Sequence, residues 1–144
     1  MVRRTLNVKP ASVLLMVAGL AAGSTSALAQ TRTWLNPVTG NWSVPGNWSG
    51  TNVPDNTGEN ALISALGGYT VFVDGNYSIG GLAIPGTVPG VQVAINNARS
   101  LDVLSIDNSG TITISDGGGG SGTNLRALSN VVISGNGAIV LNAN

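Results

Sequence analysis

The sequence contains no cysteine and no histidine. Without cysteine, no disulfide can stabilise the fold, so a packed core or contacts between repeated units must do so. Without histidine, the chain lacks a common zinc ligand and the side chain that most often acts as a general base near neutral pH. These two absences argue against a disulfide-stapled scaffold, a zinc centre and histidine-dependent catalysis.

Positive charge is also scarce. From Gln30 onward the chain has three arginines and no lysine against six acidic residues, which gives a net charge of −3. Such a surface cannot release counterions from nucleic acid and has no basic patch for anionic lipid. We therefore predict no nucleic-acid partner and no cofactor, and no stable membrane insertion once the N-terminal segment described next is removed.

The N-terminus has the features of an export signal. Two arginines and a lysine precede an apolar stretch at residues 11–22, which is too short for the roughly 20 residues of a spanning helix. A small-x-small cleavage site follows at Ala27 and Ala29. We predict a signal peptide at residues 1–29 that is cleaved before Gln30.

Aromatic residues divide the remaining chain into two parts. All six lie before residue 78: Trp34, Trp42, Trp48, Tyr69, Phe72 and Tyr77. Residues 30–68 combine tryptophan with Asn-Gly-rich turn sequences and predict an entry and capping segment. Residues 69–144 consist of short aliphatic pieces separated by Gly and Asn, which predict β coils.

The short pieces place two large aliphatic residues one position apart, the spacing that puts both on one face of a strand. They occupy residues 82–84, 93–95, 104–106, 112–114, 131–133 and 139–141. Residues 69–73 follow the same alternation, with Tyr69, Val71 and Val73 on one face. The first three pieces end at residues 84, 95 and 106, an even spacing of eleven. No helical periodicity follows the signal peptide, so the predicted class is all-β.

Very short strands at near-constant spacing favour a right-handed parallel β-helix, or β-solenoid, over a sandwich of hairpins. With coils of about 20–25 residues, residues 69–144 would make about three. The sequence stops where another strand emerges, at residues 139–141. An uncovered last coil exposes unpaired backbone groups, so we expect either a longer natural protein or coil-on-coil self-association at this C-terminal end.

The segment from Trp34 to Pro54, with its repeated Asn-Trp-Ser, resembles the N-terminal region of a known class of exported proteins. Strand-like pieces at 61–63, 69–71 and 79–84 follow it in the same pattern. It is similar to large bacterial proteins with autotransporter-associated β-strand repeats, some of which carry a PEP-CTERM sorting tail. The resemblance covers residues 30–84 and implies a secreted or cell-surface β-helical stalk. It implies no catalytic residue, and this sequence shows neither a translocator nor a sorting tail.

The three tryptophans are the first candidate site. Exposed indole faces stack on sugar rings, so Trp34, Trp42 and Trp48 could form a glycan-binding strip. The competing interpretation is that they cover the open end of the first coil, because a domain without disulfides needs the burial that large rings provide. The sequence favours the second interpretation.

Acidic residues are the second candidate. Asp74, Asp107 and Asp116 each precede Gly or Asn, where turns favour Asp, and we interpret them as turn residues rather than a catalytic pair. The glycine run at residues 117–122 lacks the Asp of a calcium-binding β-roll and the Lys and helix of a phosphate loop. We predict no catalytic residue and no dedicated metal site.

The sequence thus favours a non-enzymatic exported β-solenoid segment, acting as a surface spacer, adhesin-like element or extracellular matrix component. Its expected location is secreted or at the cell surface, associated with the outer membrane, with polysaccharide or cell-surface components as partners. Two alternatives remain: a glycan-binding module that uses the tryptophans, and the N-terminal piece of a carbohydrate-active β-helix enzyme whose catalytic part lies beyond residue 144.

Overall fold

A computed structural model describes residues 29–86, 90–115 and 122–142 of the chain. The predicted signal peptide, apart from Ala29, lies outside the described residues, as do residues 116–121 of the glycine-rich run. The first strand begins at Gln30, the residue at which the mature chain is predicted to start. Among the described residues, no helix is long and apolar enough to cross a lipid bilayer.

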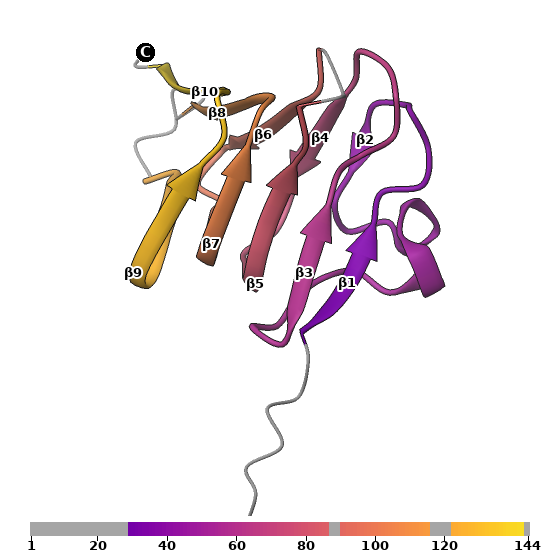
Figure 1. Ribbon diagram of the computed structural model, residues 1–144, viewed down its shortest axis with the longest axis horizontal. Helices are drawn as coiled ribbons and strands as arrows, with labels where there is room; N and C mark the ends of the chain where they lie inside the picture. Colours follow the sequence, from indigo (N-terminus) through magenta and orange to yellow (C-terminus); the bar gives the residue numbers. More distant parts are fainter. Residues whose placement is uncertain (1–28, 87–89, 116–121, 143–144) are drawn as a thin grey trace, which may run out of the picture.

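The described chain is an all-β solenoid built from two parallel sheets of five strands each (Figure 1). The odd sheet contains β1 (Gln30–Thr33), β3 (Glu59–Leu62), β5 (Tyr77–Ile84), β7 (Ser100–Asn108) and β9 (Asn124–Ser134). The even sheet contains β2 (Gly40–Asn41), β4 (Thr70–Val73), β6 (Gln92–Asn96), β8 (Thr111–Ser115) and β10 (Ala138–Asn142). One odd and one even strand together make one coil, and the predicted solenoid class is confirmed.

Coil length varies along the stack. In the even sheet, Gln92 faces Thr111 19 residues later, and Thr111 faces Ala138 27 residues later. In the odd sheet, Tyr77 faces Leu101 24 residues later. The predicted spacing of eleven is therefore about half a coil, because residue 84 lies in the odd sheet, residue 95 in the even sheet and residue 106 in the odd sheet again.

Residues 30–68 and 69–144 form one continuous stack. β1 pairs with β3 and β3 with β5, so strands from the predicted entry segment are hydrogen-bonded into the same sheet as the later coils. The entry segment also supplies two 3₁₀ turns, η1 (Pro45–Asn47) and η2 (Ser49–Thr51), which lie beyond β1 at the N-terminal end (Figure 1). The later part supplies three coils, which consist of β5 with β6, β7 with β8, and β9 with β10. This number agrees with the three coils predicted from the coil length.

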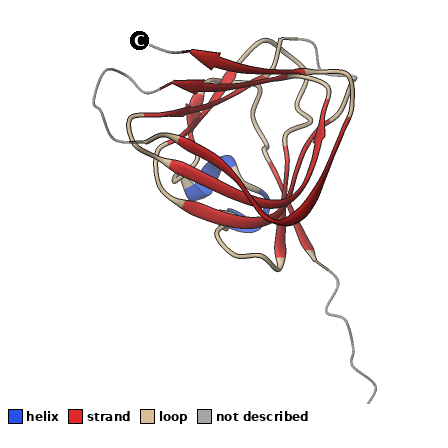
Figure 2. Cartoon of the chain, turned by 90° about the vertical axis from the view of Figure 1, so that its left-hand side faces the viewer, coloured by secondary structure: helices blue, strands red, loops and turns tan. Residues whose placement is uncertain are grey.

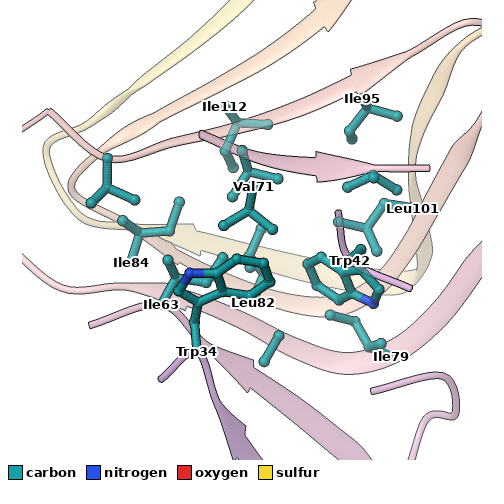
Figure 3. Packing of buried hydrophobic residues seen from close by; sticks show 14 of the residues in the cluster. Trp34, Trp42, Ile63, Val71, Ile79, Leu82, Ile84, Ile95, Leu101 and Ile112 are labelled. Carbon is teal, nitrogen blue, oxygen red and sulfur yellow. The ribbon is translucent and has the colours of Figure 1, made fainter. Parts of the chain in front are cut away.

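The aliphatic side chains of both sheets meet in one core, which the strands enclose in a triangular outline (Figure 2). Tyr69, Val71 and Val73 are all buried, which confirms the predicted alternation in β4. Figure 3 shows Trp34 and Trp42 beside the aliphatic residues of this core. Each coil buries its side chains against the next coil, so burial is shared along the stack.

One predicted alternation is wrong. Leu104 and Ile106 were expected on one face, but Leu104 is 38% exposed while Ile106 is buried. The pairing of β7 with β9 shifts register between Val103 and Ser105, whereas the pairing of β7 with β5 keeps its register through this point. In both β5 and β7 the core residues here are three positions apart instead of two: Ile79 and Leu82 in β5, and Val103 and Ile106 in β7. Leu104 therefore faces solvent.

A buried asparagine joins two coils at a corner. The Oδ1 of Asn108 accepts a hydrogen bond from the backbone N–H of Gly110 at 3.0 Å, and its Nδ2 donates to the carbonyl of Ala138 in the next coil at 3.0 Å. Gly135 lies directly against the Asn108 backbone with a φ of 90°, a conformation and a closeness that only glycine tolerates.

Replacing Asn108 with alanine should therefore leave two part-buried backbone groups, the Gly110 N–H and the Ala138 carbonyl, without these partners. We expect the free energy of unfolding to fall by about 1–3 kcal/mol, measured by urea unfolding. Asn136→Ala, at an exposed turn position nearby, is the control and should change the value by less than about 0.5 kcal/mol. Equal losses in the two variants would contradict the role assigned to Asn108.

Candidate functional site

The three candidate tryptophans lie in the core. Trp34, Trp42 and Trp48 are 1%, 0% and 0% exposed. The ring centroids of Trp34 and Trp48 are 5.1 Å apart and those of Trp42 and Trp48 are 4.7 Å apart, both in edge-to-face contact. A buried indole cannot stack on a sugar, so this structure rules out a surface strip formed by these three residues. Their place at the N-terminal end matches the competing interpretation, a cover for the first coil.

The indole N–H groups of two tryptophans also hold the entry segment together. Trp42 Nε1 donates to the carbonyl of Pro54 at 3.0 Å, and Trp48 Nε1 donates to the carbonyl of Trp42 at 2.7 Å. Trp34 and Trp48 form an antiparallel backbone bridge. Rings and backbone together hold this N-terminal end of the stack in place, and we refer to it as the cap.

A buried ion pair lies in the same region. Glu59 Oε1 accepts hydrogen bonds from Arg32 Nε at 2.9 Å and from Nη2 at 2.7 Å. Its Oε2 accepts from the backbone N–H of Asp55 and from Asn56 Nδ2. Both side chains are largely buried. Both oxygens of Glu59 are therefore engaged in holding this end of the stack together.

This ion pair could not be predicted from the sequence. Arg32 and Glu59 are 27 residues apart, and nothing in the local sequence indicates that β1 and β3 are neighbours. Arg32 lies two positions before Trp34, and Glu59 lies two positions before Ala61 on β3. This spacing is the one local feature that places both residues on the same face as a buried neighbour.

A second ion pair crosses the outside of the odd sheet. Asp102 on β7 accepts two hydrogen bonds from Arg126 on β9, from Nε at 2.7 Å and from Nη2 at 2.6 Å. Ser78 on β5 contributes a weaker contact at 3.4 Å. The hydrogen bond from Arg126 is the main cause that lowers the pKa of Asp102, against the opposing effect of its own burial.

We expect this ion pair to make the free energy of unfolding slightly sensitive to acid. Because the folded-state pKa of Asp102 is lowered, its stabilising contribution is present above the ordinary pKa of Asp, about 3.9, and is lost as the pH falls through the folded value. Asp102→Asn should therefore show a smaller fall in unfolding free energy between pH 5 and pH 3 than the natural chain, measured by urea unfolding. Arg126 is mostly exposed, so solvent screening keeps the difference small.

Arg126→Gln removes the main cause of the lowered Asp102 pKa. Like Asp102→Asn, it should therefore reduce the fall in unfolding free energy between pH 5 and pH 3. If the unfolding free energy of both variants falls between pH 5 and pH 3 as much as that of the natural chain, this ion pair does not contribute to the pH dependence.

Of the other acids singled out in the sequence, Asp74 lies between β4 and β5, as expected for a turn residue, whereas Asp107 lies within β7, so its predicted turn position is wrong. Asp74 accepts two hydrogen bonds from Ser43, from the backbone N–H at 3.0 Å and from the hydroxyl at 2.6 Å. Asp107 accepts one from the Ser134 hydroxyl at 3.2 Å. Within the described ranges, no three acidic residues gather into a set that could hold a metal ion. Asp116 lies outside the described residues.

Two hollows lie on the outer faces of the sheets. The larger, of about 490 Å³, crosses the odd sheet over the small residues Gly81 and Ala83. Its one ionisable residue is Asp107, whose carboxylate already accepts from Ser134. The smaller, of about 320 Å³, lies on the even sheet beside Phe72 and includes Asp74 and Arg99. The smaller hollow therefore brings an aromatic ring together with charges of both signs.

The pKa of the Tyr77 phenol reports on the same corner of the molecule. Burial is the main cause that raises this pKa, the negative charges of Asp74 and Asp55 add to it, and the positive charge of Arg99 opposes it. Asp74 and Arg99 come from different coils and line the same hollow. The sequence did not single out Phe72 or Arg99 as site residues.

No family model, curated protein or solved structure matches the chain.

Proposed function

We propose that this chain is an exported, non-enzymatic β-solenoid segment that serves as a surface spacer, adhesin-like element or extracellular matrix component. The observation that carries the proposal is the continuity of the two parallel sheets, in which each coil pairs with the next from β1 and β2 to β9 and β10. A stack of this kind gains length and stiffness by adding coils and needs no pocket to do its work.

The state of the described acids also supports a structural role. Glu59, Asp74, Asp102 and Asp107 all accept hydrogen bonds from other side chains or from backbone N–H groups. A hydrolytic enzyme of polysaccharides uses two carboxyl groups that are free to exchange protons with the substrate. Acids that are committed to holding coils together suit a scaffold better.

Export and processing are tested by producing the full chain in a bacterial host and sequencing the N-terminus of the product outside the cytoplasm. We expect mature protein that begins at Gln30, and antibody against it should label intact cells of the natural source or their surrounding matrix. Ala29→Arg should block the cleavage. Product that stays in the cytoplasm with its N-terminus intact would contradict the proposal.

The non-enzymatic part is tested separately. The purified chain from Gln30 onward should release no new reducing ends from soluble polysaccharides, measured with a colorimetric end-group assay. Release that disappears on heat denaturation would contradict this part and favour the carbohydrate-active alternative.

A further inference from the structure

Phe72 is the one aromatic side chain among the described residues that presents a large exposed surface, at 36%. It points outward from β4 between Asn41 on β2 and Ala94 on β6, which are its in-register neighbours. Its own neighbours along the strand, Val71 and Val73, are buried. The ring therefore lies on the outer face of the even sheet and does not fill the core. The small side chain of Ala94 lies beside it.

The small side chain of Ala94 leaves the hollow of about 320 Å³ beside this ring. The other residues that line it are mostly polar: Asn41, Val73, Asp74, Asn96, Asn97 and Arg99. Most small-molecule sites are lined mainly by apolar side chains, whereas this hollow places one ring among several polar groups, and its volume is at the lower end of such sites. It suits a group the size of one sugar ring.

The rim of the hollow is fixed by contacts between coils. Asp74 is held by the backbone N–H and the hydroxyl of Ser43 from the preceding coil. Asn97 and Ala98, which lead to Arg99, adopt φ values of 55° and 63°, and the Ala98 N–H donates to Thr123 Oγ1 at 3.1 Å. Residues other than glycine rarely adopt this left-handed backbone conformation, and here neighbouring contacts hold it in place. The polar groups of the rim are therefore positioned before a ligand binds, which lowers the entropic cost of binding.

The two charges in the hollow offer different chemistry. Arg99 is exposed and makes no ion pair within residues 29–86, 90–115 and 122–142, so its guanidinium can take a carboxylate in a bidentate pair. Each oxygen of Asp74 accepts one hydrogen bond from Ser43 and keeps a lone pair that can accept from a hydroxyl group. The site thus combines an apolar ring, hydroxyl acceptors and one cation.

We propose that the Phe72 hollow binds a uronate unit of an acidic polysaccharide. The apolar face of the pyranose ring lies on Phe72, its hydroxyls contact Asp74 and the asparagine amides, and its carboxylate pairs with Arg99. This site goes beyond the spacer role and does not depend on it, because a scaffold without the site would keep its fold and its length. It is also separate from the buried tryptophans.

The test is a titration of the ¹⁵N-labelled chain from Gln30 onward, which contains every described strand, with a hexamer of β-1,4-linked mannuronate. β-1,4-Linked mannohexaose, which carries a hydroxymethyl group in place of each carboxylate, is the matched ligand. We expect saturable shifts in the side-chain amides of Asn41, Asn96 and Asn97 with mannuronate. Mannohexaose should bind about tenfold more weakly, because it cannot pair with Arg99.

Phe72→Ala and Arg99→Gln should each weaken mannuronate binding by about tenfold, and Phe72→Leu, which keeps apolar volume without the ring, should weaken it as well. The matched controls are Leu104→Ala and Arg126→Gln, which remove an equally exposed apolar side chain and an arginine from the odd sheet, and should bind as the natural chain does. Circular dichroism establishes that each variant is folded. Absence of saturable binding by the natural chain, or binding by the Phe72 and Arg99 variants as tight as that of the natural chain, would overturn the proposal.

Discussion

Trp48→Ala should lower the free energy of unfolding by about 3–5 kcal/mol, the usual cost of truncating a large buried aromatic side chain. Trp48 is fully buried, its ring contacts both other tryptophans, and its Nε1 bonds the Trp42 carbonyl. The substitution thus opens a cavity at the centre of the cap and leaves a buried acceptor unpaired. Urea unfolding followed by far-UV circular dichroism measures the loss without depending on the removed fluorophore.

The matched control is Leu66→Ala, because Leu66 is 70% exposed and its truncation should cost less than about 0.5 kcal/mol. If Trp48→Ala does not fold, Trp48→Phe keeps an aromatic ring in the site and should show a smaller loss. A loss below about 1 kcal/mol in Trp48→Ala would mean that the tryptophans do not close the end of the stack.

The second large effect is expected at the buried ion pair of the cap. Arg32→Met and Glu59→Leu should each destabilise the chain by about 3–5 kcal/mol, because each leaves an uncompensated charge or unpaired donors in a largely buried place. The double variant should lose less than either single variant, since no buried charge then remains. Thermal and urea unfolding of the four chains completes the double-mutant cycle.

Losses that simply add in the double variant would contradict this explanation. They would indicate that the two residues contribute through separate packing contacts and not through their mutual pairing.

The fold class could be predicted from the sequence because its signal is local. Val93 and Ile95, or Tyr69 and Val71, show their shared face within one strand, and Gly and Asn mark the corners between strands. The absence of disulfides together with three closely spaced tryptophans likewise indicated that this segment needed to bury large rings. These inferences require no knowledge of which strands are neighbours.

The contacts between coils could not be predicted because the register is not constant. Arg32 and Glu59 are 27 residues apart, whereas Phe72 and its neighbour Ala94 are 22 apart. A fixed repeat length would therefore align the wrong residues. The exposure of Leu104 was missed for another reason, because the three-residue step between the core residues Val103 and Ile106 breaks the two-residue alternation that the prediction assumed.

The same limit explains why the candidate binding site was missed. Asn41, Phe72, Ala94 and Arg99 come from three coils, and only the register of the even sheet brings the first three into one row. The sequence drew attention to the tryptophans because they are the largest aromatic residues, whereas the smaller Phe72 is the ring that faces solvent.

Residue-specific hydrogen exchange of the folded chain tests most directly whether stability passes from coil to coil. Amides of the inner strands, such as Val93 in β6 and Val103 in β7, should exchange only through global unfolding, because each lies between two paired neighbours. Amides in β10, which pairs on one side only among the described strands, should exchange faster. Inner-strand amides that exchange as rapidly as those of β10 would contradict a continuous stack.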